Sequence, residues 1–211
     1  KHAILGEEMP AGGPDGLPAR PPVLCPGCPH RGVFHTFNKL GLRVMGDIGC
    51  YTLGALPPLA AIDACLCMGA SIGMAGGVER AQGKEFSKGT VAVLGDSTFI
   101  HSGITSLIDA VYNRESITVV ILDNRITGMT GHQQNPATGR DIHNEPAPQL
   151  NIEKVCEACG VNDVAVVDPF DLKATEKALR DATAREEVSV VIASRPCALL
   201  DKTAYKPYVI E

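Results

Sequence analysis

Short apolar segments alternate with amphipathic stretches along most of this chain, and this alternation limits the fold more than any other feature. Runs typical of buried strands occupy residues 43–46, 64–68, 91–94, 117–122, 164–167 and 188–193, and helical patterns occupy 32–40, 70–82, 104–113, 152–159 and 172–184. Strands that are apolar on both faces and separated by helices are typical of parallel sheets covered by helices. The sequence therefore predicts an α/β fold, a doubly wound and mostly parallel sheet with helices on both faces.

The length of 211 residues fits one such domain. Residues 1–24 contain five prolines and no helical or strand period, so we expect an extended linker or arm there. Residues 25–200 are predicted to form the folded domain and 201–211 a C-terminal tail. No apolar run approaches the roughly 18 residues of a transmembrane helix, and no signal-peptide pattern precedes the fold, so a cytoplasmic protein without a membrane span is expected.

Charge and cysteine content exclude some function classes. The net charge of −5 argues against a nucleic-acid-binding surface, which requires a basic face. Eight cysteines in an acidic chain without a secretion signal favour metal binding over disulfides.

Polar and glycine residues follow two of the predicted strands. Gly95, Asp96, Ser97 and Thr98 come directly after 91–94, and after 117–122 comes a second set: Asp123, Asn124, Ile126, Gly128 and Thr130. Glycine allows a diphosphate to approach the backbone, hydroxyls can donate to it, and side-chain oxygens of Asp96 and Asn124 are hard ligands that suit Mg²⁺. Each pair alone, Gly-Asp or Asp-Asn, is an ordinary turn sequence. Their occurrence at the ends of two apolar strands indicates a diphosphate and magnesium site, because ligands bind at the carboxyl ends of such strands.

Four cysteines lie in loops at strand ends or before the first helix. Cys25 and Cys28 form a Cys-x-x-Cys pair, Cys50 follows the first strand, and Cys197 follows the last. Four thiolates in loops are able to hold a [4Fe–4S] cluster or a zinc ion. Cys156 and Cys159 lie one helical turn apart, and we interpret them as structural.

Two histidines are candidate catalytic residues. His30 lies in the loop of the Cys-x-x-Cys pair, and His101 follows Thr98 by three residues. Either imidazole could bind a substrate carboxylate or move a proton. The alternative for each is an ordinary solvated loop residue.

The motif Gly95-Asp96-Ser97, followed after 25 residues by Asp123-Asn124, resembles the thiamine-diphosphate motif in the form found in 2-oxoacid:ferredoxin oxidoreductases. The stretch from Gly128 through Met129 and Thr130 to Gln133 also resembles that family. The resemblance implies that the side chains of Asp96 and Asn124 and the backbone carbonyl of Ile126 bind Mg²⁺. It also implies a [4Fe–4S] cluster on the family's four cysteine positions, here Cys25, Cys28, Cys50 and Cys197.

Longer motifs, such as Cys-Pro-Gly-Cys-Pro-His-Arg and Gly-Asp-Ile-Gly-Cys-Tyr-Thr-Leu-Gly, are similar to the indolepyruvate branch of that family over roughly residues 21–200. This resemblance implies oxidative decarboxylation of an aryl 2-oxoacid to an acyl-CoA, with coenzyme A as co-substrate and ferredoxin as electron acceptor. It further implies a hetero-oligomer in which a second thiamine-binding region supplies the activating glutamate.

Two other functions remain open at this stage. One is a non-oxidative thiamine-dependent 2-oxoacid decarboxylase subunit of the sulfopyruvate type, which needs no cluster. The other is a zinc-stabilised binding module, which leaves the two polar strand ends unexplained.

Overall fold

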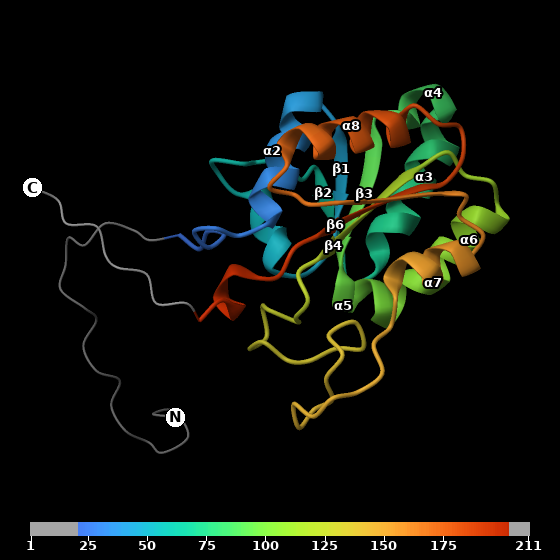
Figure 1. Cartoon of the computed structure of the whole chain (residues 1–211). Coiled ribbons are helices and arrows are strands. Elements are labelled where there is room, and N and C mark those ends of the chain that lie inside the picture. Colours follow the sequence, from blue (N-terminus) through green and yellow to red (C-terminus); the bar gives the residue numbers. More distant parts are fainter. Residues whose placement is uncertain (1–20, 203–211) are drawn as a thin grey trace, which may run out of the picture.

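The computed structural model describes residues 21–202, so most of the expected arm and tail lies outside the described part of the chain (Figure 1). Leu24, which the sequence assigns to the arm, is buried in the core with Val33 and Phe34. None of the helices between residues 21 and 202 combines the length and apolar character that crossing a bilayer requires.

The sheet contains six strands, all parallel, and confirms the predicted fold class. Across the sheet the order is β2 (Ala64–Cys65), β1 (Arg43–Gly46), β3 (Thr90–Gly95), β4 (Thr118–Asp123), β6 (Ser189–Ser194) and β5 (Asp163–Val167). β2 ends three residues earlier than expected. Its only neighbour, β1, ends at Gly46, and Gly46 pairs with Cys65, so the next residues have no strand to pair with.

Helices cover both faces of the sheet (Figure 1). One face carries α3 (Ala70–Gln82), α6 (Ile104–Tyr112) and α7 (Ile152–Ala158), and the other carries α2 (His30–Leu40) and α8 (Leu172–Thr183). Successive strand residues serve opposite cores: in β3, Ala92 packs in the first and Val93 in the second. The central strands are therefore apolar on both faces, as their continuous apolar sequence predicts.

Five short helical segments complete the described part of the chain, and all but α4 (Lys84–Ser87), which joins α3 to the start of β3, follow the carboxyl ends of strands. The other four are η1 (Cys50–Ala55), α5 (Asp96–Thr98), η2 (Phe99–Gly103) and η3 (Ala198–Leu200). α5, η2 and α6 follow one another without a break, and η2 is a single π-helical turn, a feature often found at functional sites. A Cβ atom on Gly103 would come within 2.7 Å of Leu94 Cδ1, so glycine permits this turn to lie against β3.

A long connection, residues 124–151, joins β4 to α7 and lies beyond the carboxyl ends of the strands (Figure 1, yellow). It contains no helix or strand and only two isolated bridges, Thr127 with Gln133 and Arg140 with Pro146. Connections of this length inside a compact domain are uncommon and usually functional.

Asp47, directly after β1, fixes the geometry of this end of the sheet. Its buried carboxylate accepts hydrogen bonds from the backbone N–H groups of Ile48 (2.7 Å), Gly69 (2.8 Å) and Ser71 (3.4 Å). The bonds to Gly69 and Ser71 tie the end of β1 to the first turn of α3.

We predict that Asp47→Ala lowers the free energy of unfolding by about 2–4 kcal/mol, because it leaves buried N–H groups without an acceptor. Chemical denaturation measures this change. Asp109→Ala, which removes an exposed carboxylate on α6, is the control and should change stability by less than about 0.5 kcal/mol. Equal stability of the two variants would contradict the structural role given to Asp47.

Candidate functional site

Two adjoining cavities lie at the carboxyl ends of β1, β3 and β4. The first, about 90 Å³, contains Asp96 and is called here the Asp96 cavity. The second, about 260 Å³, contains four cysteines and is called the cysteine cavity. Five residues line both and form a shared wall: His30, Cys50, Asn124, Gly128 and Met129.

The structure brings together every residue for which the sequence predicts cofactor binding. All of them line the Asp96 cavity: Gly95, Asp96, Ser97, Thr98, Asn124, Ile126, Gly128, Met129 and Thr130. They come from two loops that follow the adjacent parallel strands β3 and β4. The parallel register of β3 and β4 therefore brings both loops to the same edge of the sheet.

Close packing fixes the turn after β3. A Cβ atom on Gly95 would stand 2.7 Å from Cε1 of Tyr51, so only glycine fits beside this ring. The Tyr51 hydroxyl donates to the Ile48 carbonyl oxygen at 2.9 Å and lies 3.3 Å from Thr98 Oγ1. Tyr51 thus locks the turn after β3 to the loop after β1.

Asp96 is a buried carboxylate at the base of its cavity, 2% exposed. Its pKa is raised from the ordinary 3.8 to about 6, mainly by burial and in part by the nearby Asp123, although a hydrogen bond from Asn135 Nδ2 to Asp96 Oδ2 (3.1 Å) opposes the shift. A divalent cation would offset the cost of holding this charge out of water.

Asn124 and Ile126 complete the group of expected magnesium ligands. Both are buried, and Asn124 Oδ1 accepts from the backbone N–H of Ile126 at 3.3 Å. Asn124 Nδ2 faces Nε2 of His30 at 3.5 Å, which makes that ring nitrogen the acceptor. Burial lowers the pKa of His30 to about 4, so the imidazole is neutral at pH 7.

The four cysteines predicted to hold a cluster all line the cysteine cavity. Cys25 and Cys28 come from the turn before α2, Cys50 begins η1, and Cys197 follows β6. Arg31 supports the turn, since its guanidinium donates to the carbonyl oxygens of Leu24 and Cys25. These hydrogen bonds give Arg31 a structural role at the turn that carries Cys25 and Cys28.

The cysteine thiols influence one another electrostatically. The pKa of Cys28 is raised to about 11, mainly by burial, with contributions from Cys197, Cys25 and Cys50, while the backbone N–H of His30 has the opposite effect. Burial also raises the pKa of Cys50, with contributions from Cys197 and Cys25. Cys28 and Cys50 are therefore protonated at neutral pH in the free chain, and binding of a metal centre would release their protons.

The donor set of the cysteine cavity suits a metal centre that binds four thiolates. Four cysteines line this one cavity, and thiolates are the ligands of a [4Fe–4S] cluster. Within residues 21–202, no three His, Cys, Asp or Glu side chains form a group that could hold a single metal ion.

A backbone hydrogen bond joins the two cavities. The N–H of Cys197 donates to the carbonyl oxygen of Asn124 at 2.9 Å, and the N–H of Arg195 donates to that of Asp123 at 3.0 Å. The cysteine after β6 is thereby held in register with the expected magnesium ligand after β4.

The two candidate catalytic histidines have different surroundings. His30 is buried in the shared wall, beside Asn124 and edge-on to the Tyr51 ring at 6.0 Å. His101 is exposed in η2 and lines neither cavity. The structure therefore brings only His30 to the site.

The remaining cysteines lie elsewhere. Cys156 is fully buried in the core with Cys159 packed against it, which agrees with a structural role. Cys67 is exposed after β2, where a strand residue was expected, and Cys65 ends that strand.

Sequence reasoning missed two residues of the site, Tyr51 and Asn135. Asn135 stands before Pro136, a pair that is ordinary in turns, and it reaches Asp96 only because the long connection folds back toward the end of β3. No local pattern marks Asn135, whereas Tyr51 lies inside the Gly-Asp-Ile-Gly-Cys-Tyr-Thr-Leu-Gly motif, which by itself does not indicate the contact with Gly95.

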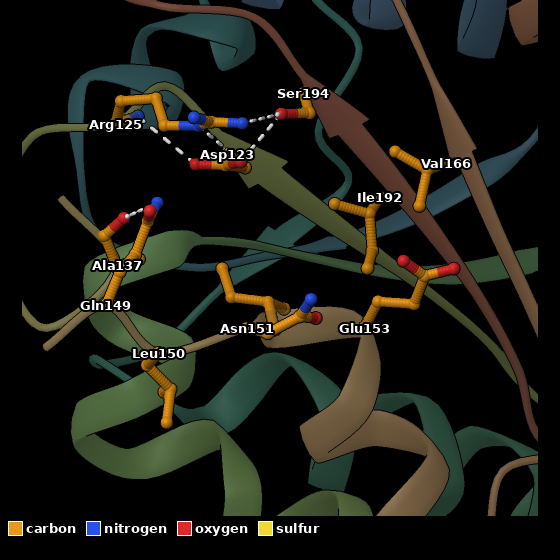
Figure 2. Close-up of a pocket in the computed structure, with 11 residues that line it drawn as sticks. Asp123, Arg125, Ala137, Gln149, Leu150, Asn151, Glu153, Val166, Ile192 and Ser194 are labelled. Carbon is orange, nitrogen blue, oxygen red and sulfur yellow. Dashed lines mark hydrogen bonds and ion pairs between the residues drawn. The ribbon is translucent and has the colours of Figure 1, made fainter. Parts of the chain in front are cut away.

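A further cavity of about 390 Å³ opens beside the end of β4 and shares no lining residue with the other two (Figure 2). In it the Asp123 carboxylate accepts from Arg125 Nε (3.2 Å) and Ser194 Oγ (2.7 Å). Asp123 and Asn124 thus serve different cavities, and Asp123 braces the ends of β4 and β6 against each other.

Comparison with known proteins agrees with this geometry. Residues 47–193 match the family model described as thiamine pyrophosphate enzyme, C-terminal TPP binding domain. Indolepyruvate oxidoreductase subunit IorA of Pyrococcus horikoshii is 46% identical over 197 residues, which cover 87% of this chain and 30% of that protein. The 2-oxoglutarate synthase subunit KorB of Archaeoglobus fulgidus is 26% identical over 186 residues, which cover 81% of this chain and 68% of that subunit.

Among solved structures, the 2-oxoglutarate:ferredoxin oxidoreductase of Magnetococcus marinus, with 2-oxoglutarate, coenzyme A and succinyl-CoA bound, superposes with a TM-score of 0.71. It is 19% identical and the match covers 84% of this chain and 65% of that one, so the likeness concerns the fold. The chain spans less than a third of the indolepyruvate relatives. The family match, over most of the described residues, shows that the chain belongs to the thiamine pyrophosphate enzymes and forms their C-terminal TPP-binding domain.

Proposed function

We propose that this chain is the diphosphate-binding part of an enzyme that oxidatively decarboxylates an aryl 2-oxoacid of the indolepyruvate type. In the overall reaction the 2-oxoacid and coenzyme A give an acyl-CoA, CO₂ and a proton, and two electrons pass through a [4Fe–4S] cluster to ferredoxin. The observation that supports this most is the shared wall: a cavity with diphosphate-site residues adjoins one with four cysteines. The similarity to indolepyruvate oxidoreductase subunits supports the substrate.

The Asp96 cavity would hold thiamine diphosphate through Mg²⁺. The side chains of Asp96 and Asn124 and the carbonyl oxygen of Ile126 would bind the ion, and the turns at Gly95 and Gly128 would admit the diphosphate. When bound, thiamine diphosphate supplies a nucleophilic carbon and an electron sink for the carbanion left by loss of CO₂. The protein would position the cofactor, because the register of β3 and β4 and the contact between Tyr51 and Thr98 hold the loops after these strands in place before the cofactor binds.

Cys25, Cys28, Cys50 and Cys197 would hold the [4Fe–4S] cluster, which accepts electrons one at a time. The cysteine cavity is separated from the Asp96 cavity only by the residues common to both. His30 lies in that wall as a neutral imidazole, with Nε2 accepting from Asn124. Its contribution is therefore to orient the Asn124 amide through this hydrogen bond, while burial keeps the imidazole uncharged beside the expected magnesium ligands.

Two alternatives make different demands on the cysteines. A non-oxidative 2-oxoacid decarboxylase subunit would not need four thiols around one cavity. A zinc-stabilised module would need at least three of them around one ion, an arrangement not found between residues 21 and 202. The cluster-containing oxidoreductase accounts for both cavities.

We predict that Asp96→Asn stabilises the metal-free chain and abolishes Mg²⁺-dependent binding of thiamine diphosphate. Because the folded-state pKa, about 6, exceeds the ordinary 3.8, ionised Asp96 costs folding free energy at pH 7.5, on the order of 3 kcal/mol. The gain of the variant should shrink as the pH falls below about 6 and vanish well below 3.8, where the wild-type carboxyl is protonated in both states. Chemical denaturation in EDTA measures the gain in stability, and calorimetry with Mg²⁺ measures the loss of thiamine diphosphate binding. Retained Mg²⁺-dependent binding would remove Asp96 from the metal site.

The cluster is tested by iron and sulfide analysis of the anaerobically purified chain. We expect about four iron atoms and four sulfides per wild-type chain. Cys197→Ser should lose or convert the cluster and change the EPR spectrum of the reduced protein. Cys67→Ser, at an exposed cysteine outside the cavity, is the matched control and should leave both unchanged. Zinc without iron in the wild type would instead support the binding-module alternative.

The chain alone is predicted to show no 2-oxoacid-dependent reduction of a viologen dye. Thiamine activation requires a carboxylate, usually glutamate, at the aminopyrimidine ring, and no described glutamate lines the Asp96 cavity. The two buried ones are engaged elsewhere: Glu79 accepts from the backbone N–H of Ser116, and Glu115 pairs with Arg80. Addition of the partner thiamine-binding region should restore turnover. Rapid dye reduction without a partner would show that the activating group lies in this chain.

A further inference from the structure

We propose that Asn135 is a positioning residue for the metal at the Asp96 cavity: its side-chain amide holds the Asp96 carboxylate in the orientation that binds the ion. Asn135 lies outside the glycine motifs and does not line the cavity itself. The inference rests on the proposed function, because it assumes that Asp96 binds a divalent cation with thiamine diphosphate.

The contact is short and buried. Asn135 Nδ2 donates to Asp96 Oδ2 at 3.1 Å, and Asn135 and Asp96 are 8% and 2% exposed. In the part of the chain that the structure describes, no other side chain is seen to donate to this carboxylate. The Asn135 amide thus fixes Oδ2 from the protein side, and the backbone N–H groups of Asp96 and Ser97 add hydrogen bonds to the same carboxylate.

The amide of Asn135 has only one consistent orientation. Its Oδ1 accepts from the backbone N–H of Ala137 at 2.9 Å, and its Nδ2 also approaches Thr127 Oγ1 at 3.4 Å. The group that faces a backbone donor must be the oxygen, so the group that faces the carboxylate must be the nitrogen. Exchange of the two atoms would put a donor against a donor and an oxygen against a carboxylate.

The long connection holds Asn135 in this place from both sides. Before it, Thr127 and Gln133 form a pair of backbone hydrogen bonds, at 3.0 and 3.1 Å. After it, Gln149 Nε2 donates to the Ala137 carbonyl oxygen at 2.8 Å, a contact visible in Figure 2. Gln149 therefore braces the same turn without touching Asp96, and this makes it a matched control.

The two roles of Asn135, bracing the turn and holding Asp96, are separable by substitution. Asn135→Asp keeps an oxygen for the Ala137 N–H but replaces the donor to Asp96 by a negatively charged acceptor. Asn135→Ala removes both interactions. Gln149→Ala weakens the turn and leaves the bond to Asp96 in place.

The experiment measures Mn²⁺ uptake by EPR in the assembled enzyme freed of metal, with saturating thiamine diphosphate. Loss of a group that orients a metal ligand typically costs 10–100-fold in affinity. We expect the Mn²⁺ dissociation constant to rise about 10-fold or more in Asn135→Ala and Asn135→Asp, and to stay near the wild-type value in Gln149→Ala.

Three results would overturn the inference alone, while leaving the proposed function intact. They are unchanged or tighter Mn²⁺ binding by Asn135→Asp, unchanged binding by Asn135→Ala, and an equal loss in Gln149→Ala, which would show that order in the turn matters and not the hydrogen bond. Absence of Mn²⁺ uptake by the wild-type enzyme would instead overturn the metal site of the proposed function, and the inference with it.

Discussion

The carboxylate of Asp47 is the interaction on which the rest of this site depends. It accepts hydrogen bonds from the backbone N–H groups of Gly69 and Ser71 at the first turn of α3. The backbone carbonyl oxygen of Asp47 accepts a further hydrogen bond from Thr52 Oγ1 at 2.7 Å. Thr52 Oγ1 in turn accepts from the N–H of Gly49 at 2.9 Å. These bonds set the start of η1, and η1 supplies Cys50 to both cavities and Tyr51 to the Asp96 cavity.

The site is built from groups whose charged forms burial disfavours. Burial raises the pKa of Asp96 and of Cys28 and lowers that of His30. For Asp96 and Cys28, burial disfavours the negative charge that a bound cation would stabilise. For His30, burial disfavours the positive charge, so the imidazole stays neutral and its Nε2 can accept a hydrogen bond. Strands that are fully buried on both faces supply the rigidity that keeps these groups in place.

The sequence was sufficient to predict the parts of the molecule that follow from periodicity and from strand ends. The parallel sheet with helices on both faces is confirmed, α3 has the predicted bounds, and the residues expected at the cofactor lie in one cavity. This succeeds because the carboxyl ends of parallel strands converge, so a residue's distance from its strand end determines its place at the site.

The parts that the sequence did not predict depend on contacts between distant segments. Asn135 lies 39 residues from Asp96, and its position comes from the path of the long connection rather than from a local pattern. The π turn at η2 depends on packing of Gly103 against Leu94, and the early end of β2 depends on where β1 stops. His101 was likewise not placed correctly from the sequence. It lies three residues after Thr98, but in the π-helical turn η2 its side chain is exposed to solvent.

The residues shared by the two cavities couple their shapes. Met129 and Cys50 each line both cavities, so a larger side chain at either position takes volume from one cavity or the other. The outer walls are not shared: Met68 lines the Asp96 cavity without lining the cysteine cavity, and Leu199 does the reverse. A substitution in an outer wall can therefore reshape one cavity alone, whereas a substitution at any of the five shared residues alters both.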